Sequence, residues 1–243
     1  MRSCFLVGIC ILLFGSCDTG NNSLPDVGMD YFPLKVGVYQ IYTVDETQIS
    51  QSIEQKFVYE LKFQVVDSTI NQEGEYTYII QRQKRDNANL PWNNIDSWTA
   101  RIANRQAIIK DGNTSFVNLS FPTVNGLEWD GNAFNALAGD QYCGENKDQK
   151  CDIFKLGNVH EEFLMTGGMT FAETLIVIQN DDPDLITKYD VRKEVYAKKV
   201  GLIYKEAAVL QFCTSTKAPD CLGKQKVDKG FRYKQVIKEY GSD

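Results

Sequence analysis

Apolar and polar residues alternate along most of the chain from Tyr31 onward, and this two-residue period is typical of half-buried β-strands. Within residues 57–66, one face of such a strand carries the apolar side chains of Phe57, Tyr59, Leu61, Phe63 and Val65. The alternation predicts strands over Val38–Val44, Glu54–Val66, Glu75–Gln83, Trp98–Ala103, Gln106–Lys110, Ser115–Leu119, Phe171–Gln179, Lys188–Ala197, Leu202–Phe212 and Phe231–Tyr240. A helical period is missing, apart from a short turn near residues 132–138.

Turn-forming residues separate the predicted strands, as in segments 71–74, 111–113 and 180–184. Such short connections favour antiparallel pairing, because parallel strands need long crossovers. One apolar face and one polar face are typical of a curved sheet, a sandwich or an incomplete barrel. We therefore predict a mainly β protein with a single antiparallel domain over residues 31–243, in one of these three forms.

The first residues have the pattern of a secretory signal peptide. Arg2 precedes the apolar run from Phe5 to Phe14, which is too short to span a bilayer. Gly15 and Ser16 stand directly before Cys17 and resemble a bacterial lipobox. We expect residues 1–16 to be a signal peptide, Cys17 to carry lipid (palmitate among its acyl chains), and the polar segment 17–30 to be a flexible tether. The alternative is cleavage elsewhere and a soluble secreted protein.

The remaining cysteines form two pairs with the same spacing. Cys143 and Cys151, and likewise Cys213 and Cys221, are separated by seven residues of a polar loop. An even number of cysteines in an exported chain favours disulfides, and these two local pairings close the shortest loops. A zinc site is the alternative, but the spacing differs from that of zinc knuckles and His160 is the only histidine.

The net charge of −6 comes from acidic and basic residues that are interleaved along the chain. Nucleic-acid binding requires clustered lysines and arginines, so we expect no nucleic-acid partner. No Gly-rich phosphate loop, nucleophile elbow or cofactor motif occurs in the sequence, and we expect no cofactor.

Three segments resemble uncharacterised lipoproteins of the Bacteroidota. Residues 31–45 contain FPLKVG-x-Y-x-x-Y, residues 119–135 contain an FP…G-x-x-W-x-G element, and residues 194–206 contain YA-x-x-VGL-I. In that family these elements recur in this order. The resemblance implies a β-rich module tethered to the membrane, with no established substrate. We expect it in the cell envelope, at the outer membrane, on the periplasmic face or the cell surface.

Aromatic and polar side chains suggest two binding surfaces. Trp129, Asp130 and Asn132 place an aromatic face beside carboxylate and amide groups, which suits a carbohydrate platform. The alternative is that Trp129 covers one end of the core while Asp130 begins a turn. Trp92 and Trp98 bracket a polar stretch and present a second aromatic surface with the same alternative.

Two weaker patterns concern metal binding and modification. Asp181, Asp182 and Asp184 lie in one loop and could supply oxygen ligands to calcium, although turns favour the same residues. Asp67-Ser68-Thr69 resembles the sequon at which Bacteroidota O-glycosylate exported proteins, so Ser68 is a candidate site. We predict no other metal site.

These patterns together favour a non-catalytic binding or assembly module of the envelope. Its partners would be the membrane, through the lipid, and an envelope protein, a glycan or a small apolar ligand. A large cavity would favour a ligand carrier. The alternative is a carboxylate-dependent hydrolase acting on glycans, with two carboxylates facing each other in a cleft and raised pKa values.

Overall fold

The computed structural model describes residues 26–137, 141–143, 149–165, 168–217 and 220–243, and the side chains of residues 141–151 are left out of the description. The predicted signal peptide and the lipidation site at Cys17 lie outside the described residues. No helix among the described residues is long and apolar enough to cross a membrane.

A single antiparallel sheet contains twelve of the strands, and the fold class predicted from the sequence is confirmed. The first half of the chain forms β1 (Val38–Ser50), β2 (Ile53–Ile70), β3 (Tyr76–Arg85), β4 (Asn93–Ala103), β5 (Gln106–Asp111), β6 (Thr114–Ser120) and β7 (Glu128–Asp130). The second half forms β10 (Ile153–Leu164), β11 (Thr170–Asp182), β12 (Lys188–Ala197), β13 (Gly201–Phe212) and β14 (Val227–Ser242). A separate hairpin consists of β8 (Gln141–Cys143) and β9 (Gln149–Cys151).

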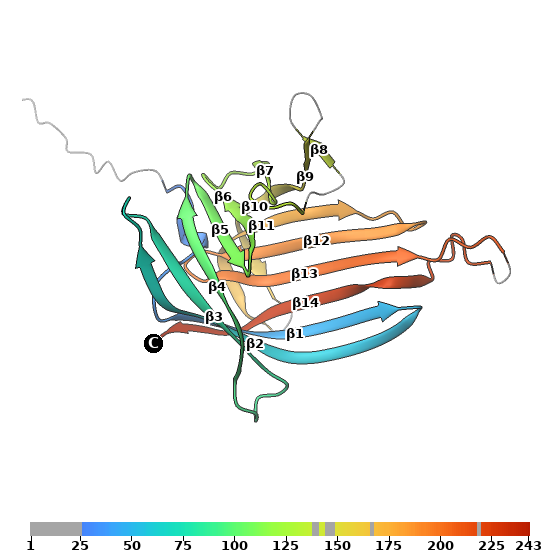
Figure 1. The fold of residues 1–243 in the computed structure, drawn as a ribbon, viewed down its shortest axis with the longest axis horizontal. Helices are drawn as coiled ribbons and strands as arrows, with labels where there is room; N and C mark the ends of the chain where they lie inside the picture. The colour runs from blue at the N-terminus through green and yellow to red at the C-terminus, as the bar shows by residue number, and fades with distance from the viewer. Residues whose placement is uncertain (1–25, 138–140, 144–148, 166–167, 218–219) are drawn as a thin grey trace, which may run out of the picture.

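The order of strands in the sheet is β6-β5-β4-β3-β2-β1-β14-β13-β12-β11-β10-β7. Strands close in sequence therefore pair, as the short turns indicate, and the terminal strands β1 and β14 meet in the middle of the sheet. In Figure 1, β1, β2 and β12–β14 run side by side along the molecule, whereas β3–β6 cross them steeply. The sheet thus curls around its own concave face.

The two edges of the sheet come together at a seam between β6 and β7. The Val117 N–H donates to the Gly131 carbonyl at 2.9 Å, and the Trp129 indole N–H donates to the Val117 carbonyl at 2.9 Å. A Cβ at Gly131 would lie 2.4 Å from the ring of Phe154, so only glycine fits this close approach. Because the described part of the seam has few such bonds, the sheet is a barrel that is nearly, but not fully, closed.

The larger apolar core joins residues from both halves of the sheet. Its fully buried members include Tyr31, Leu119, Leu156, Leu175 and Val177. A second, smaller cluster contains Val195 and Ile203 together with Phe163 of β10 and Phe171 of β11. Both sides of β12 therefore contribute residues to an apolar cluster, with Tyr196 in the larger one and Val195 in the smaller one.

Residues 26–31 contact the barrel although the sequence assigns 26–30 to the tether. Lys198 Nζ lies 2.7 Å from Asp26 and 2.8 Å from Glu173. The short 3₁₀ turn η1 (Met29–Tyr31) buries Tyr31, whose hydroxyl lies 3.1 Å from His160 Nδ1. This segment is thus part of the folded body.

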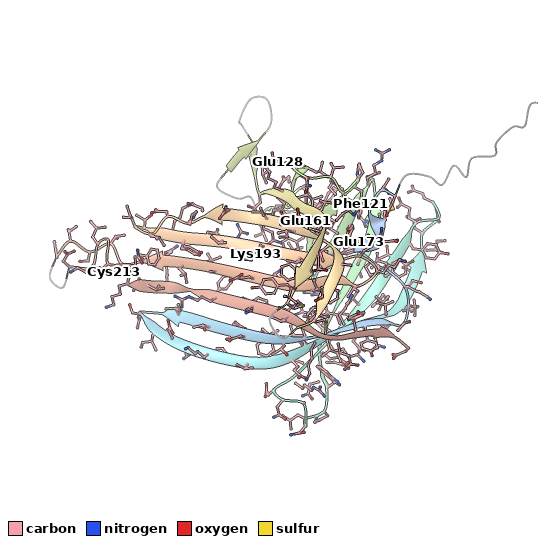
Figure 2. All side chains as sticks on the ribbon, turned by 180° about the vertical axis from the view of Figure 1, so that it is seen from behind. Phe121, Glu128, Glu161, Glu173, Lys193 and Cys213 are labelled. Atoms are coloured by element: carbon pink, nitrogen blue, oxygen red, sulfur yellow. A yellow bond between two sulfur atoms is a disulfide. The ribbon has the colours of Figure 1, made fainter. Side chains whose placement is uncertain are left out.

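One predicted disulfide is present at the far end of β13. Cys213 and Cys221 are bonded, with their Cα atoms 5.7 Å apart (Figure 2). The other predicted pair belongs to the β8–β9 hairpin, where Cys143 is placed opposite Gln149 in the register. The side chains of Cys143 and Cys151 lie outside the described residues, so their disulfide stays a prediction.

Candidate functional site

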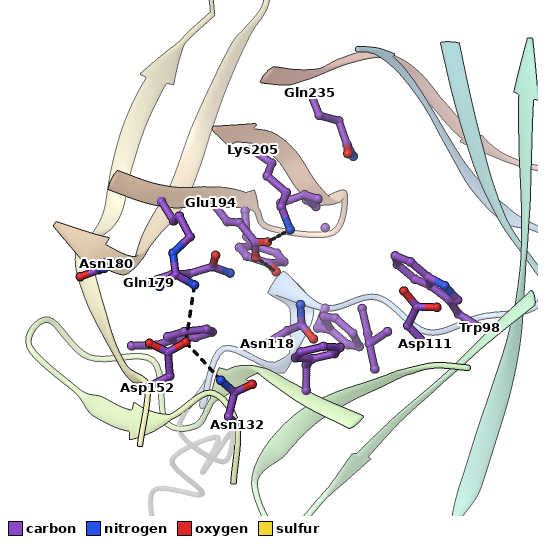
Figure 3. A pocket seen from close by; sticks show the side chains of 18 of the residues that line it. Trp98, Asp111, Asn118, Asn132, Asp152, Gln179, Asn180, Glu194, Lys205 and Gln235 are labelled. Atoms are coloured by element: carbon purple, nitrogen blue, oxygen red, sulfur yellow. Dashed lines mark hydrogen bonds and ion pairs between the residues drawn. The ribbon is translucent and has the colours of Figure 1, made fainter. Parts of the chain in front are cut away.

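The interior of the barrel contains a cavity of about 1010 Å³ (Figure 3). This volume is at the upper end of the range of small-molecule sites, about 300–1,000 Å³. One part of the wall is apolar and largely aromatic: Phe63, Ile80, Trp98, Ile109, Phe116 and Phe154. The cavity can therefore bury a sizeable apolar group.

A row of polar side chains crosses the opposite wall on three neighbouring strands. Glu194 of β12 pairs in register with Lys205 of β13, which pairs with Gln235 of β14. Lys205 Nζ lies 2.8 Å from one carboxylate oxygen of Glu194. The Tyr196 hydroxyl donates to the other oxygen at 2.5 Å, and it also contacts the Asn118 side chain. Since Glu194 is only 1% exposed, these two partners hold a buried charge in place.

Three buried polar atoms, on residues that line the cavity, have no hydrogen-bond partner among the described residues. They are the Gln235 amide nitrogen, the Trp98 indole nitrogen and the Asn118 amide oxygen. The other end of the Gln235 amide accepts the Tyr233 hydroxyl at 2.7 Å, which fixes its orientation, and Gln235 is 3% exposed. An unsatisfied buried group costs about 1–3 kcal/mol, so a partner from outside the chain would be favourable here.

A second polar group occupies another side of the cavity. Arg192 lies 2.8 Å from Asp190 and 3.5 Å from Asp152, and the Asn132 amide donates to Asp152 at 3.1 Å. Burial raises the pKa of Asp152, and the neighbouring carboxylates of Asp190 and Asp130 add to this, while Arg192 opposes it. Burial is thus the main cause of the raised pKa of Asp152.

Burial also raises the pKa values of two cavity tyrosines, Tyr42 and Tyr196. The nearby carboxylate of Glu194 raises both pKa values further. Both hydroxyls therefore stay protonated at neutral pH and act as donors, the Tyr42 hydroxyl to the Leu202 carbonyl at 2.8 Å. Neither is activated as a base or nucleophile.

The predicted carbohydrate platform of Trp129, Asp130 and Asn132 is divided between the seam and the cavity. Trp129 is 7% exposed and uses its N–H in the seam. One Asp130 oxygen accepts the backbone N–H groups of Asn132 and Asp152 at 3.0 Å, which shapes the turn. Asn132 lines the cavity. Of the three, only Asn132 is thus positioned to contact a ligand in the cavity.

The two tryptophans of the other predicted aromatic surface, Trp92 and Trp98, also lie in different places. Trp98 lines the cavity, with the Arg82 guanidinium 3.9 Å from the centre of its ring. Trp92 instead stacks on Arg85 at 4.1 Å, outside the cavity lining. The two rings do not form one surface.

The calcium candidates do not converge on one point. Asp182 forms an ion pair with Lys188 at 2.9 Å, and Asp184 accepts the Thr187 hydroxyl at 2.6 Å. Hydrogen bonds from Thr187 and from the backbone of Ile186 lower the pKa of Asp184. Among the described residues, no group of three or more histidines, cysteines or carboxylates could hold a metal ion. These aspartates instead support the turn after β11.

Ser68, the O-glycosylation candidate, lies within β2 and is opposite Tyr78 of β3. Its side chain is half-buried, and its backbone N–H donates to Asp67 at 2.7 Å. A glycan on Ser68 would therefore be attached to a paired strand and not to a loop.

The polar row on the cavity wall was not predicted from the sequence. Glu194, Lys205 and Gln235 lie on three different strands, and the strand register brings them together. The available signal was the alternation in Lys188–Ala197, where every second position, from Lys188 to Tyr196, is polar or aromatic.

No family model matches the sequence, and no curated protein matches it. The structure is similar to a candidate exported protein with a YmcC-like fold from Bacteroides fragilis, at 13% identity and a TM-score of 0.41, covering 87% of this chain and 98% of that chain. It is also similar to a candidate lipoprotein from Parabacteroides distasonis, at 11% identity and a TM-score of 0.36, with the same coverage of 87% and 98%. Identities and TM-scores this low support no transfer of function from either protein.

Proposed function

We propose that this protein is a lipid-anchored protein of the cell envelope that binds an amphiphilic small molecule in its barrel cavity. The anchor is Cys17, and the ligand places its apolar part against Trp98, Phe63 and Phe116. Its polar part meets the unpaired atoms of Gln235 and Asn118.

The observation that carries this proposal is the combination of an apolar wall with unpaired polar atoms in one cavity. A cavity lined only by apolar groups would suit a hydrocarbon, and a wholly polar one would suit water or a sugar. Here the Gln235 amide nitrogen and the Trp98 indole nitrogen are donors, and the Asn118 oxygen is an acceptor. The polar part of an amphiphile can engage some of these groups while its apolar part covers the aromatic wall.

Binding is favoured over glycan hydrolysis by the arrangement of the carboxylates. A glycosidase needs two carboxyl groups that flank a substrate bond. Asp152 and Asp190 instead share the guanidinium of Arg192, and Glu194 is held by Lys205 and Tyr196. Each of these carboxylates is already engaged by a partner within the chain.

Nile red, a neutral dye that fluoresces in apolar surroundings, tests the cavity as a binding site. We expect saturable binding of one dye per protein. Ile109→Trp fills part of the cavity and should weaken binding at least tenfold, whereas Ile95→Trp, the same exchange at an exposed site outside the cavity lining, should leave it unchanged. Circular dichroism confirms that both variants fold.

Equal binding by all three proteins would place the dye elsewhere and would overturn the cavity proposal. If Ile109→Trp does not fold, Phe116→Trp serves as the second cavity-filling variant, because Phe116 is half-buried on the same wall.

The anchor is tested separately by intact mass and peptide mapping of protein purified from native membranes. A diacylated N-terminal Cys17 is expected. An unmodified N-terminus would refute the lipid anchor and leave the cavity proposal to stand on the dye experiment.

A further inference from the structure

The cavity has a pronounced excess of negative charge. Its described lining contains three cationic side chains, Lys188, Arg192 and Lys205. It also contains six carboxylates, which are Asp111, Asp152, Asp181, Asp182, Asp190 and Glu194. The formal excess is therefore three negative charges.

Each of the three cations is already paired with a carboxylate of the same lining. Lys205 lies 2.8 Å from Glu194, and Lys188 lies 2.9 Å from Asp182. Arg192 is shared by two carboxylates, as described above. An incoming anion would have to displace one of these partners, whereas an incoming cation would not.

Nearby cations outside the lining do not reverse this balance. Arg82 lies over the ring of Trp98 but forms an ion pair with Asp96 at 3.1 Å. Figure 3 shows the carboxylate of Asp152 on one side of the cavity and that of Asp111 beside Trp98 on the other. Negative charge thus flanks the apolar wall on both sides.

The unpaired amide oxygen of Asn118 provides an independent sign that a ligand belongs here. This buried acceptor belongs to a residue of the lining and has no partner among the described residues. An ammonium N–H can satisfy it, so the carboxylates do not stand alone as an acidic patch in this aromatic-walled cavity.

We infer that the cavity selects cationic amphiphiles, molecules with an amine or quaternary ammonium group attached to an apolar chain. This inference rests on the proposed function and names the ligand class for the same site. The ammonium group lies among the carboxylates, where Coulomb attraction is only partly screened, and the chain covers Trp98 and Phe63.

Three probes with the same dodecyl chain test the charge preference by displacing Nile red below their micelle concentrations. They are dodecyltrimethylammonium, the neutral tetraethylene glycol monododecyl ether, and dodecanoate. We expect the cation to bind at least tenfold more tightly than the anion at low salt, with the neutral ether between them. The ratio should shrink as salt is added.

Two double variants locate the origin of the preference. Asp111→Asn with Asp181→Asn removes two exposed carboxylates of the lining and should reduce the ratio of cation to anion affinity at least threefold. Glu73→Gln with Glu162→Gln removes two exposed charges outside the lining and should leave the ratio unchanged.

The outcomes separate this inference from the proposed function. Displacement by the neutral ether together with equal or tighter binding of dodecanoate would overturn the charge selection and leave amphiphile binding intact. An equal effect of the two double variants would also overturn it, because net charge and not the cavity would then set the preference. Failure of all three probes to displace the dye would overturn the proposed function as well.

Discussion

Replacing Lys205 by methionine should destabilise the protein strongly, because it would leave the Glu194 carboxylate buried without its cationic partner. Glu194 is 1% exposed and would keep only the Tyr196 hydroxyl. Removing one member of a buried ion pair costs about 3–5 kcal/mol. The Lys205 side chain is 36% exposed, so some water reaches the pair and we expect the lower end, about 3 kcal/mol. That is a large part of a typical stability of about 5–15 kcal/mol.

The same two strands provide a matched control on their outer face. Lys193 and Glu206 face each other in register at 3.0 Å, and their side chains are 43% and 41% exposed. Figure 2 shows Lys193 on this face of the sheet. Lys193→Met should cost less than about 1 kcal/mol, because water screens an exposed pair.

Urea unfolding, followed by tryptophan fluorescence and circular dichroism, measures these changes. The double variant Glu194→Gln with Lys205→Met should recover most of the lost stability, because glutamine still accepts the Tyr196 hydroxyl without carrying a charge. A loss with Lys205→Met no larger than with Lys193→Met would refute the description of Glu194 as a desolvated charge. If the double variant is as unstable as Lys205→Met alone, the loss of stability comes from altered packing and not from the unpaired charge of Glu194.

Three further predictions concern the seam, a carboxylate and the disulfide. Gly131→Ala should lower the free energy of unfolding by about 1–3 kcal/mol, because the new methyl group overpacks the seam. Gly157→Ala should lower it by no more than about 0.5 kcal/mol, because a Cβ there meets nothing within 4 Å. Equal losses of the two variants in urea unfolding would contradict this. Burial raises the folded-state pKa of Asp152 above its unfolded value. The stability that the protonated carboxyl contributes is therefore fully present below the unfolded pKa and is lost as pH rises through the folded pKa. The stability of Asp152→Asn relative to wild type should therefore increase from pH 4 upward and then level off, and a decrease would show that the ionised form is the one stabilised. Replacing Cys213 and Cys221 by serine should lower stability by about 2.5 kcal/mol, the chain-entropy value for a loop of this length, and an unchanged urea midpoint would place the loop outside the cooperative unit.

Most of the sheet was predictable from local patterns. All ten predicted strands are present, and β12 has the predicted bounds Lys188–Ala197. The strands that were missed have physical reasons. β7, β8 and β9 are each three residues long, and β10 is irregular between Gly157 and Glu161, where Asn158 and His160 adopt positive φ values and interrupt the alternation.

The closure of the sheet and the contents of the cavity were less predictable. The seam depends on a contact between Val117 and Gly131, which no local pattern encodes. The polar face of β12 resembles a solvated face in sequence, since Glu194 alternates with Val195. In the structure Val195 belongs to the second apolar cluster, and Glu194 lines the cavity inside the barrel. An alternating strand reveals that its faces differ, but long-range packing decides which face is inside.

The polar interior supports the proposal that the cavity binds a ligand. Replacing a buried ion pair by apolar residues of similar size is often neutral or stabilising, and the unpaired atoms of Gln235, Trp98 and Asn118 each cost free energy in an empty cavity. A barrel selected only for stability would fill this space with apolar side chains, as it does around Leu119 and Leu175. The same chain thus contains a packed apolar core and, beside it, a cavity whose lining residues carry three buried polar atoms without partners among the described residues. That contrast is expected if the missing partners are supplied by a ligand.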